Sequence, residues 1–571
     1  MLESAAEKKV FLPNDFIPNS WESIEPFLTE LDKRVIADVE SLKLWLKDRS
    51  TLDGLLQENL GWRYIHQTCD TSNEVYRENL EFFINEIEPK LSEFNDRLNR
   101  KLLENPFTKE LNESSYIVFL RGISTEVALF RQENVPILTE LQLLSNEYGR
   151  ITGKMSIEVN GESMTFQKAA NLLKSENREL RKEIYEKINF RRAEDREELE
   201  ALFDKMIQLR HQVALNAGFE NYRDYMFAAL GRFDYTVEDC ELFHTSIEKY
   251  IVPLIDQYDS LRLEKLGYDN LYPWDTEIDV DKKSPLSPFK NSEELIDKTI
   301  ACFRKVNDSY GDVIELMNQK GHLDLDSRIG KAPGGYNYPL HKTSLPFIFM
   351  HATGSLRDMV TMMHEGGHAI HSWLSKDLEL NGFKETPSEI AEVASMAMEL
   401  ISMEHWEVFF KDEDELNRAK RYQLEKILTI LPWIACIDAF QHWIYTHPSH
   451  SREDRKNKWL ELSRRFSGKV IDKSLYPDFE SYSWHRQLHL FEVPFYYLEY
   501  GIAQLGAIGI WRNYKMDPKT GLTKYEKALA EGYTYTLPEL YNHAGIEFNF
   551  SESYVKELVE FVSLQSASFK N

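Results

Sequence analysis

The dominant pattern along the chain is helical. Apolar residues recur at spacings of three and four in two long segments, and this spacing places each set on one face of a helix. Strand signals are few, so the pattern predicts a mainly α protein with a small β element. The first apolar stripe comprises Leu28, Leu31, Val35, Val39, Leu42 and Leu46, and the second comprises Leu199, Leu202, Phe203, Met206 and Val213.

Two short segments have the character of strands. Residues 157–159 alternate before Asn160-Gly161, a pair that suits a tight hairpin turn. Residues 347–350 are apolar and follow a glycine-bearing loop at 333–336. We expect a β-hairpin near residues 155–165 and a strand shortly before the histidine-rich helix described below.

Composition and charge narrow the class of protein. The 571 residues are 42% hydrophobic and 28% charged, as in a globular protein that is not disordered. The formal net charge of -26 argues against a general affinity for nucleic acid or anionic membranes. We therefore expect neither nucleic acid nor a membrane as a partner.

Cysteine usage and the apolar segments favour a cytoplasmic location. The four cysteines are scattered without any CxxC pair, which suits a reducing compartment. The N-terminus lacks the basic start and apolar core of a secretory signal. The most apolar stretch, residues 427–440, is interrupted by Pro432 and Asp438 and is too short to span a membrane. The cysteines are Cys69, Cys240, Cys302 and Cys436.

The segment HEGGH at residues 364–368 carries the strongest chemical signal. Ser355 and Asp358 resemble a capping box that opens a helix running to about residue 374. On such a helix His364 and His368 share one face, about 6 Å apart along the axis. Glu365 is rotated by about 100° from His364, so it is placed to bond a water on the metal and not to ligate the ion. This is the HExxH arrangement of two metal ligands and a general base.

The surroundings of this motif favour a metal site over two surface histidines. Methionine, valine, alanine and isoleucine flank it, so we expect the helix to be largely buried, and buried ionisable residues need partners or a metal. Gly366 and Gly367 each cost a helix roughly 1 kcal/mol relative to alanine. We therefore expect another backbone or a substrate to approach closely there.

His371 lies on nearly the same face but does not qualify as the third ligand. Its α-carbon is about 10 Å from that of His364 along the axis, too far to share one tetrahedral ion with both histidines. The metzincin pattern also fails, because it needs Gly and His where this chain has Ile370 and Leu374. We interpret His371 as a pocket residue, a residue that supports a ligand, or a packed core histidine.

The third ligand must then come from another element. Residues 386–389 resemble a helix start, with Thr386 as the cap and Glu389 as its capping-box partner. Glu392 lies one turn further in among small apolar residues, so metal ligation explains this carboxylate better than a solvated surface does. Glu399 is seven residues further, on the same face, where it can accept a hydrogen bond from a ligand imidazole or form a surface charge.

With these motifs, the sequence resembles the thimet oligopeptidase and oligoendopeptidase F family of zinc peptidases. The chain departs from the family by placing Gly366 where a bulky residue is common, which affects the shape of the pocket. The resemblance spans residues of about 160 to 510 in order. It rests on residues 364–371, residues 391–395 with Glu399, Trp484, His489, residues 494–501, residues 216–222 and the glycine loop near Gly334.

The resemblance implies a two-lobed helical shell around a deep substrate channel, with one Zn²⁺ on its floor and a small β element beside the zinc helix. It implies cleavage of short, unstructured peptides, because folded proteins cannot enter the channel. By analogy, the strand at residues 347–350 would pair with the substrate backbone as an edge strand. We place an N-terminal helical lobe at residues 1–195 and the catalytic domain at residues 196–571.

The family also uses hydrogen-bond donors from the segment that follows His489. His489 and Tyr500 match its pattern. The second tyrosine is Tyr496 by the oligoendopeptidase pattern and Tyr497 by the spacing of thimet-type enzymes, and a packed aromatic core is the alternative for any one of them.

The sequence therefore predicts a zinc endopeptidase. His364, His368 and Glu392 hold Zn²⁺ and leave a fourth position for water, Glu365 acts as general base, and Tyr500 with His489 assists the oxyanion. The alternatives are a zinc carboxypeptidase or dipeptidyl carboxypeptidase, with Arg486 as a candidate cation for the substrate C-terminus, a noncatalytic peptide-binding relic, and a metal-independent scaffold. Peptide length, side-chain preference and oligomeric state are not encoded in these patterns.

Overall fold

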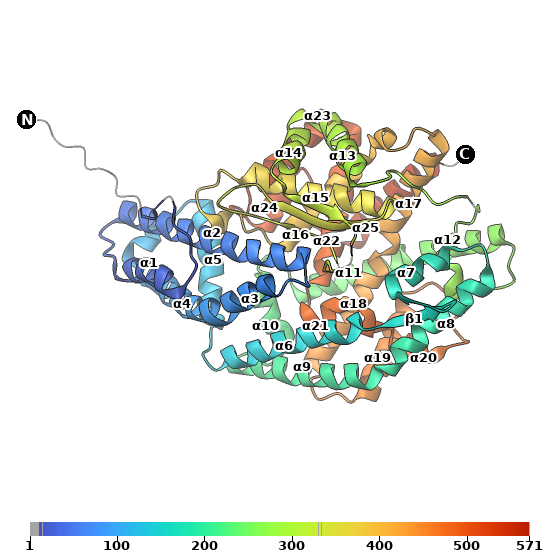
Figure 1. Cartoon of the computed structure of the whole chain (residues 1–571), viewed down its shortest axis with the longest axis horizontal. Coiled ribbons are helices and arrows are strands. Elements are labelled where there is room, and N and C mark those ends of the chain that lie inside the picture. Colours follow the sequence, from blue (N-terminus) through green and yellow to red (C-terminus); the bar gives the residue numbers. More distant parts are fainter. Residues whose placement is uncertain (1–10, 14, 282, 329, 333, 570–571) are drawn as a thin grey trace, which may run out of the picture. The chain divides into compact units, whose positions relative to one another are not determined.

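The computed structural model describes residues 11–13, 15–281, 283–328, 330–332 and 334–569, and it is mainly α (Figure 1). The chain divides into two compact units, each built from three interleaved segments. Unit 1 comprises residues 1–128, 286–416 and 506–548, and unit 2 comprises residues 129–285, 417–505 and 549–571. The sequence predicted two consecutive domains, 1–195 and 196–571, and that boundary stays a prediction.

Unit 1 contains a three-stranded sheet, β3 (Leu323–Asp326), β4 (Tyr336–Tyr338) and β5 (Phe347–Ala352). Its helices are α1 (Trp21–Lys33), α2 (Val39–Cys69), α3 (Glu74–Phe82), η1 (Phe83–Ile87), α4 (Glu88–Glu104), η2 (Pro106–Glu110), α5 (Ser114–Leu129), α13 (Ser292–Val306), α14 (Asp308–Gln319), α15 (Leu356–Ser375), η5 (Asn381–Phe383), α16 (Ser388–Met403), η6 (Trp406–Val408), α23 (Pro518–Ala530) and α24 (Leu537–His543).

Unit 2 contains one hairpin, β1 (Ser156–Val159) and β2 (Glu162–Thr165), among the residues that the structure describes. Its helices are α6 (Asn134–Gly153), α7 (Phe166–Ala170), η3 (Asn171–Lys174), α8 (Arg178–Glu194), α9 (Arg196–Asn216), α10 (Tyr222–Ala229), α11 (Val237–Tyr250), α12 (Val252–Leu266), η4 (Pro273–Asp275), α18 (Leu431–Thr446), α19 (Arg452–Arg465), α20 (Pro477–Ser481), η7 (Ser483–Arg486), α21 (Leu488–Glu492) and α25 (Glu552–Ser568). Two further helices, α17 (Glu413–Thr429) and α22 (Tyr497–Met516), cross from one segment to the next.

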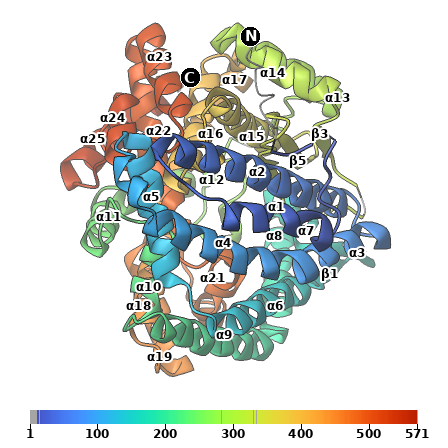
Figure 2. The same ribbon diagram turned by 90° about the vertical axis from the view of Figure 1, so that its left-hand side faces the viewer.

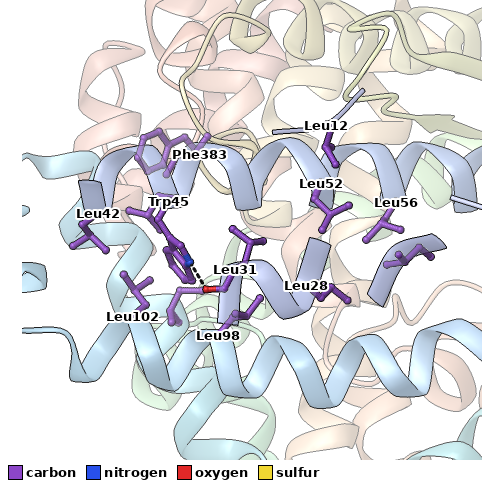
Figure 3. Packing of buried hydrophobic residues seen from close by; sticks show 14 of the residues in the cluster. Leu12, Leu28, Leu31, Leu42, Trp45, Leu52, Leu56, Leu98, Leu102 and Phe383 are labelled. Carbon is purple, nitrogen blue, oxygen red and sulfur yellow. Dashed lines mark hydrogen bonds between the residues drawn. The ribbon is translucent and has the colours of Figure 1, made fainter. Parts of the chain in front are cut away.

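Helices α1, α2 and α4 pack together in unit 1 around a leucine-rich core (Figures 2 and 3). The Trp45 indole N–H donates to the carbonyl of Leu31 at 2.9 Å within this core. The prediction that the apolar stripe from Leu28 to Leu46 lies on a single helix is wrong, because α1 ends at Lys33 and Val35 is 84% exposed. Asp38 caps α2 through a hydrogen bond from the Ser41 backbone N–H, and this cap restarts the helix.

The sheet of unit 1 has the order β3-β5-β4. Strand β5 pairs in parallel with β3 and antiparallel with β4, so the predicted strand at residues 347–350 exists. Its predicted role as an edge strand is wrong, because both of its sides are occupied along Ile348 and Phe349. Strand β4 forms an edge of this sheet instead.

A buried lysine fastens the sheet. The Lys331 ammonium donates to the carbonyl of Met350 on β5 at 2.6 Å and to the Asp324 carboxylate on β3 at 2.9 Å. Burial alone would raise the pKa of Asp324, but hydrogen bonds from Arg328, Cys69 and Lys331 hold it well below its usual range. The charged groups therefore lock β3 to β5, the strand that leads into α15.

In unit 2 the hairpin prediction is confirmed. Ile157 pairs with Met164, and both turn residues, Asn160 and Gly161, have positive φ values of 54° and 83°. Such a turn matches the twist of the two strands. The second apolar stripe is also confirmed, because all five of its residues lie buried on α9.

Within the part of the chain that the structure describes, one helical stretch is long and apolar enough to cross a membrane. Within residues 413–446 an 18-residue window has a mean hydropathy of 1.4, but 72% of that window is buried inside the protein. Pro432 occupies the first turn of α18, and the stretch has the burial of a core segment.

Candidate metal and catalytic site

Helix α15 begins where the sequence predicts. The Ser355 side chain accepts a hydrogen bond from the Asp358 backbone N–H at 3.2 Å, and the Asp358 carboxylate accepts one from the Ser355 N–H at 3.1 Å. This reciprocal capping box satisfies two donors that the first turn of a helix leaves without partners. The phase of the helix is thus fixed about two turns before the HEGGH motif.

The two glycines of the motif allow close packing. A Cβ on Gly367 would lie 2.6 Å from the Ser395 Cα and 2.9 Å from the Met398 Cβ of α16, so no side chain fits between the helices. A Cβ on Gly366 would lie 2.6 Å from the Phe303 ring of α13. The predicted approach of another backbone is confirmed at Gly367, and it brings α16 against α15 (Figure 1).

This packing brings the three predicted metal ligands together. The Glu392 carboxylate lies 3.3 Å from His364 Nε2 and 3.8 Å from His368 Nε2. Ligands about 2.0–2.2 Å from a tetrahedral zinc are separated by about 3.3–3.6 Å. Both histidine side chains are 19% exposed and Glu392 is buried, so the donors fit Zn²⁺ in a site with an open side.

Glu399 makes the two histidines differ. Its carboxylate accepts a hydrogen bond from His364 Nδ1–H at 2.7 Å, which directs Nε2 of the ring towards Glu392. Burial opposes charge on His364, but the bonds with Glu392 and Glu399 raise its pKa well above 6.5. His368 has no such support, and burial lowers its pKa to about 4.

Glu365 has the properties of a general base. The residue is 6% exposed, and its Oε2 has no hydrogen-bond partner among the residues that the structure describes. Burial, followed by the neighbouring carboxylates, raises its pKa to about 7. A buried carboxylate oxygen without a partner needs a water, a substrate or a cation beside it.

Two further predictions concern His371 and the start of helix α16. His371 is buried, its Nε2 has no partner in the described part of the chain, and burial lowers its pKa to about 3. The predicted capping box at residues 386–389 is wrong, because α16 begins at Ser388 with Pro387 as the N-cap residue and no side-chain cap. Thr386 lies one residue too early to take that role.

Two residues of the site were not predicted. The Asn337 side chain on β4 donates to the Glu365 carbonyl at 3.2 Å and ties the edge strand to α15. The Ser395 hydroxyl lies 3.3 Å from the Glu392 carboxylate. Ser395 was visible as the residue three positions after Glu392, whereas nothing in the sequence relates residue 337 to residue 365.

The predicted oxyanion donors lie in unit 2, on and before α22. The His489 ring lies 4.7 Å from the Tyr497 ring, 6.2 Å from Tyr496 and 5.9 Å from Tyr500, measured between centroids. Phe495 precedes the group with a φ of 70°, and its backbone N–H donates to the side chain of Gln441 at 2.6 Å. This left-handed residue turns the chain into α22. The four rings form one cluster, and neither Tyr496 nor Tyr497 is favoured by these contacts.

The chain was compared with family models and with known proteins. A model of peptidase family M3 matches residues 171–560, and a model of the peptidase M3 N-terminal domain matches residues 13–130. Oligopeptidase PepF of Bacillus subtilis is 21% identical over 69% of this chain and 58% of its own length. An oligoendopeptidase F homolog of Borreliella burgdorferi is 23% identical over 68% of this chain and 65% of its own length. The matches thus span less than two thirds of either relative.

Solved structures share the fold over nearly the whole chain. Pz peptidase A, solved with an inhibitor, superposes with a TM-score of 0.88 at 25% identity, covering 96% of each chain. Oligoendopeptidase F from Enterococcus faecium gives 0.66 at 14% identity, covering 96% of this chain and 97% of that one. The mainly α fold predicted from the sequence is confirmed.

Proposed function

The chain belongs to peptidase family M3, and from that membership we propose that it is a zinc-dependent endopeptidase that hydrolyses short, unstructured oligopeptides. One observation carries the proposal: two histidines and Glu392 converge at ligand distances beside Glu365, a buried carboxylate with a partnerless oxygen. A metal-independent scaffold has no use for this arrangement, because the buried carboxylates of Glu365 and Glu392 cost free energy unless they are satisfied.

The residues of unit 1 divide the chemistry among them. His364, His368 and Glu392 would hold the ion, and Glu399 keeps His364 oriented through its Nδ1–H. When bound, Zn²⁺ acts as a Lewis acid and lowers the pKa of a coordinated water towards about 7. Glu365 accepts the proton from the attacking water and returns it to the leaving amine.

Peptide recognition is assigned to the edge strand. Strand β4 has one side free of strand partners in the described sheet, and Asn337 at its centre is bonded to the backbone of Glu365. We assign the pairing with substrate backbone to β4 and not to β5, since an extended peptide adds to a sheet only at an edge. A peptide bound there runs beside the catalytic helix.

The resemblance supplies the remaining parts of the proposal. Tyr500 and His489, with one of Tyr496 and Tyr497, stabilise the oxyanion in this scheme. The channel that admits only short peptides, the single catalytic zinc and a cytoplasmic location are further parts of it. Alanine or phenylalanine at each of the four positions, assayed for kcat, separates a donor from a packing ring.

The decisive experiment compares cleavage of a short internally quenched peptide by wild type and by Glu365→Gln, with products identified by mass. The proposal expects internal cleavage by wild type and none by the variant, which still binds zinc. Release of only one or two C-terminal residues would favour a carboxypeptidase, with Arg486 as the first residue to replace. Equal cleavage by both proteins would contradict the role of Glu365. Glu389→Gln, a buried carboxylate one turn before Glu392, is the matched control.

A further inference from the structure

Unit 2 contains a second cluster of metal-binding side chains. Helix α11 carries Cys240 and His244, and helix α18 carries Asp438 and His442. Each pair is four residues apart, so both members lie on one face of their helix. The two helices pack against each other (Figure 1), and the four side chains meet between them.

The distances are those of a ligand set. One ligand atom each from Cys240, Asp438 and His442 lies within 4.8 Å of the others. His442 Nε2 is 3.2 Å from the Asp438 carboxylate, close to the separation of about 3.3 Å expected around tetrahedral zinc. His244 Nε2–H donates to the same carboxylate at 2.8 Å and holds it in position.

Hydrogen bonding alone leaves this cluster unsatisfied. Asp438 is fully buried and His442 is 8% exposed. Within the described residues, Asp438 Oδ1 and His442 Nδ1 have no hydrogen-bond partner, and the contact of His442 Nε2 is the 3.2 Å approach to Asp438 Oδ2. The His244–Asp438 pair explains only one of the two carboxylate oxygens. Two buried polar atoms without a partner, beside an imidazole and a carboxylate that already face each other, call for a further group in this place.

We propose that Cys240, Asp438 and His442 form a second, buried metal site that takes Zn²⁺, with His244 as the residue that positions the Asp438 carboxylate. Thiolate, imidazole and carboxylate are the three side-chain ligand types of protein-bound zinc. The Cys240 thiol now donates to the Thr236 carbonyl at 3.3 Å, so binding displaces one proton from sulfur. This site is independent of the proposed peptidase activity.

The surroundings of this cluster are closed and aromatic. The Phe227, Phe495 and Phe466 rings surround the two imidazoles at centroid distances of 5.5–6.2 Å.

The test uses the full chain with the first site removed, as the His364→Ala/His368→Ala variant, produced in medium containing Co²⁺ so that the ion is present during folding. We expect one bound Co²⁺ with thiolate-to-Co²⁺ charge-transfer absorption, and two bound ions in wild type. Cys240→Ala in the same background should lose both ion and absorption. Cys436→Ala, a buried cysteine on the same helix as Asp438, should keep both.

His244→Ala separates positioning from ligation. We expect this variant to bind Co²⁺ about 10- to 100-fold more weakly with the charge-transfer absorption retained. If the double variant folds yet binds no ion and shows no such absorption, the proposal is wrong, whatever the behaviour of the Cys240 variant.

Discussion

The two histidine clusters are built alike and exposed differently. Each places two potential ligands four residues apart on one helix and completes the set from a neighbouring helix. The side chains of the ligand histidines of α15 are 19% exposed, whereas those of the proposed ligands His442 and Asp438 of the second cluster are 10% and 0% exposed. Catalytic zinc sites keep an open position and structural sites are closed.

The two clusters also differ in the residue that follows each ligand in the sequence. Glu365 follows His364 directly and leaves an oxygen without a partner, whereas the residue after Asp438 is Ala439 and that after His442 is Trp443. A metal-bound water at the second cluster would have no base beside it in these positions. In our proposal, ligand geometry marks both clusters as metal sites, and exposure together with an adjacent base assigns catalysis to the first.

The largest expected effect comes from removing the base. Glu365→Gln should lower kcat/KM by about 10²- to 10⁴-fold, because only the proton-accepting group is lost. The bound metal, counted by elemental analysis, should be unchanged. Glu389→Gln should retain activity, and a Glu365→Gln protein that had also lost its metal would undo the distinction between ligand and base.

The next largest effect is expected from changing the distance between helices α15 and α16 at the first cluster. Gly367→Ala should destabilise the protein by about 1–3 kcal/mol and weaken zinc binding, because the new methyl meets the α16 backbone, which cannot move aside. Gly366→Ala meets the Phe303 side chain instead and should cost less. Thermal unfolding and zinc titration of the pair provide the measurement. Equal losses from the two variants would mean that the backbone contact is not what limits the spacing.

The positioning residues should behave alike in both clusters. Glu399→Ala should weaken zinc binding at the first site by about 10- to 100-fold, because His364 loses its acceptor and its fixed orientation. At saturating zinc the peptidase rate should recover. A rate that stays low at saturating zinc would assign Glu399 a role beyond orientation.

The smallest expected effect is on the pH dependence of stability in the metal-free protein, where Glu365 and Asp438 should contribute with opposite sign. The pKa of Glu365 is raised from 4.5 to about 7 by burial, so its contribution to stability falls as pH rises through that window. The pKa of Asp438 is lowered from 3.8, so its contribution is present above that value and lost as pH falls. The difference in Tm between Glu365→Gln and wild type should therefore become more positive by roughly 2–5 °C when the pH is raised from 5 to 7. Asp438→Asn should instead reduce the fall in Tm as the pH is lowered below neutral. Plots of Tm against pH that run parallel to wild type for both variants would contradict both assignments.

The sequence allowed prediction where the signal was local. The capping box at Ser355, the spacing of His364 and His368, and the turn at residues 160–161 all depend on residues within one or two turns of each other. Glu392 was proposed as a ligand from its apolar neighbours, and the structure places its carboxylate 3.3 Å from His364 Nε2. The single helix expected through Val35 was wrong because a cap at Asp38 outweighed a continuing apolar stripe.

Contacts between residues far apart in the sequence could not be predicted from these local patterns. His244 and Asp438 are 194 positions apart, and each helix alone shows two polar residues on an apolar face. Strand β5 was found, but the occupation of both its sides depends on β3 and β4, which have weak strand signals of their own. Such contacts come from tertiary packing, and no local propensity records them.

The interleaved order of unit 1 has a consequence during synthesis. Helix α15 packs on α23, and the Tyr525 hydroxyl of α23 donates to the Ala394 carbonyl of α16 at 2.7 Å. Ribosomes release the chain from its N-terminus, so the ligand helices emerge well before the helix that supports them. The helices of the proposed peptidase site therefore complete their packing late, after most of the polypeptide has left the ribosome.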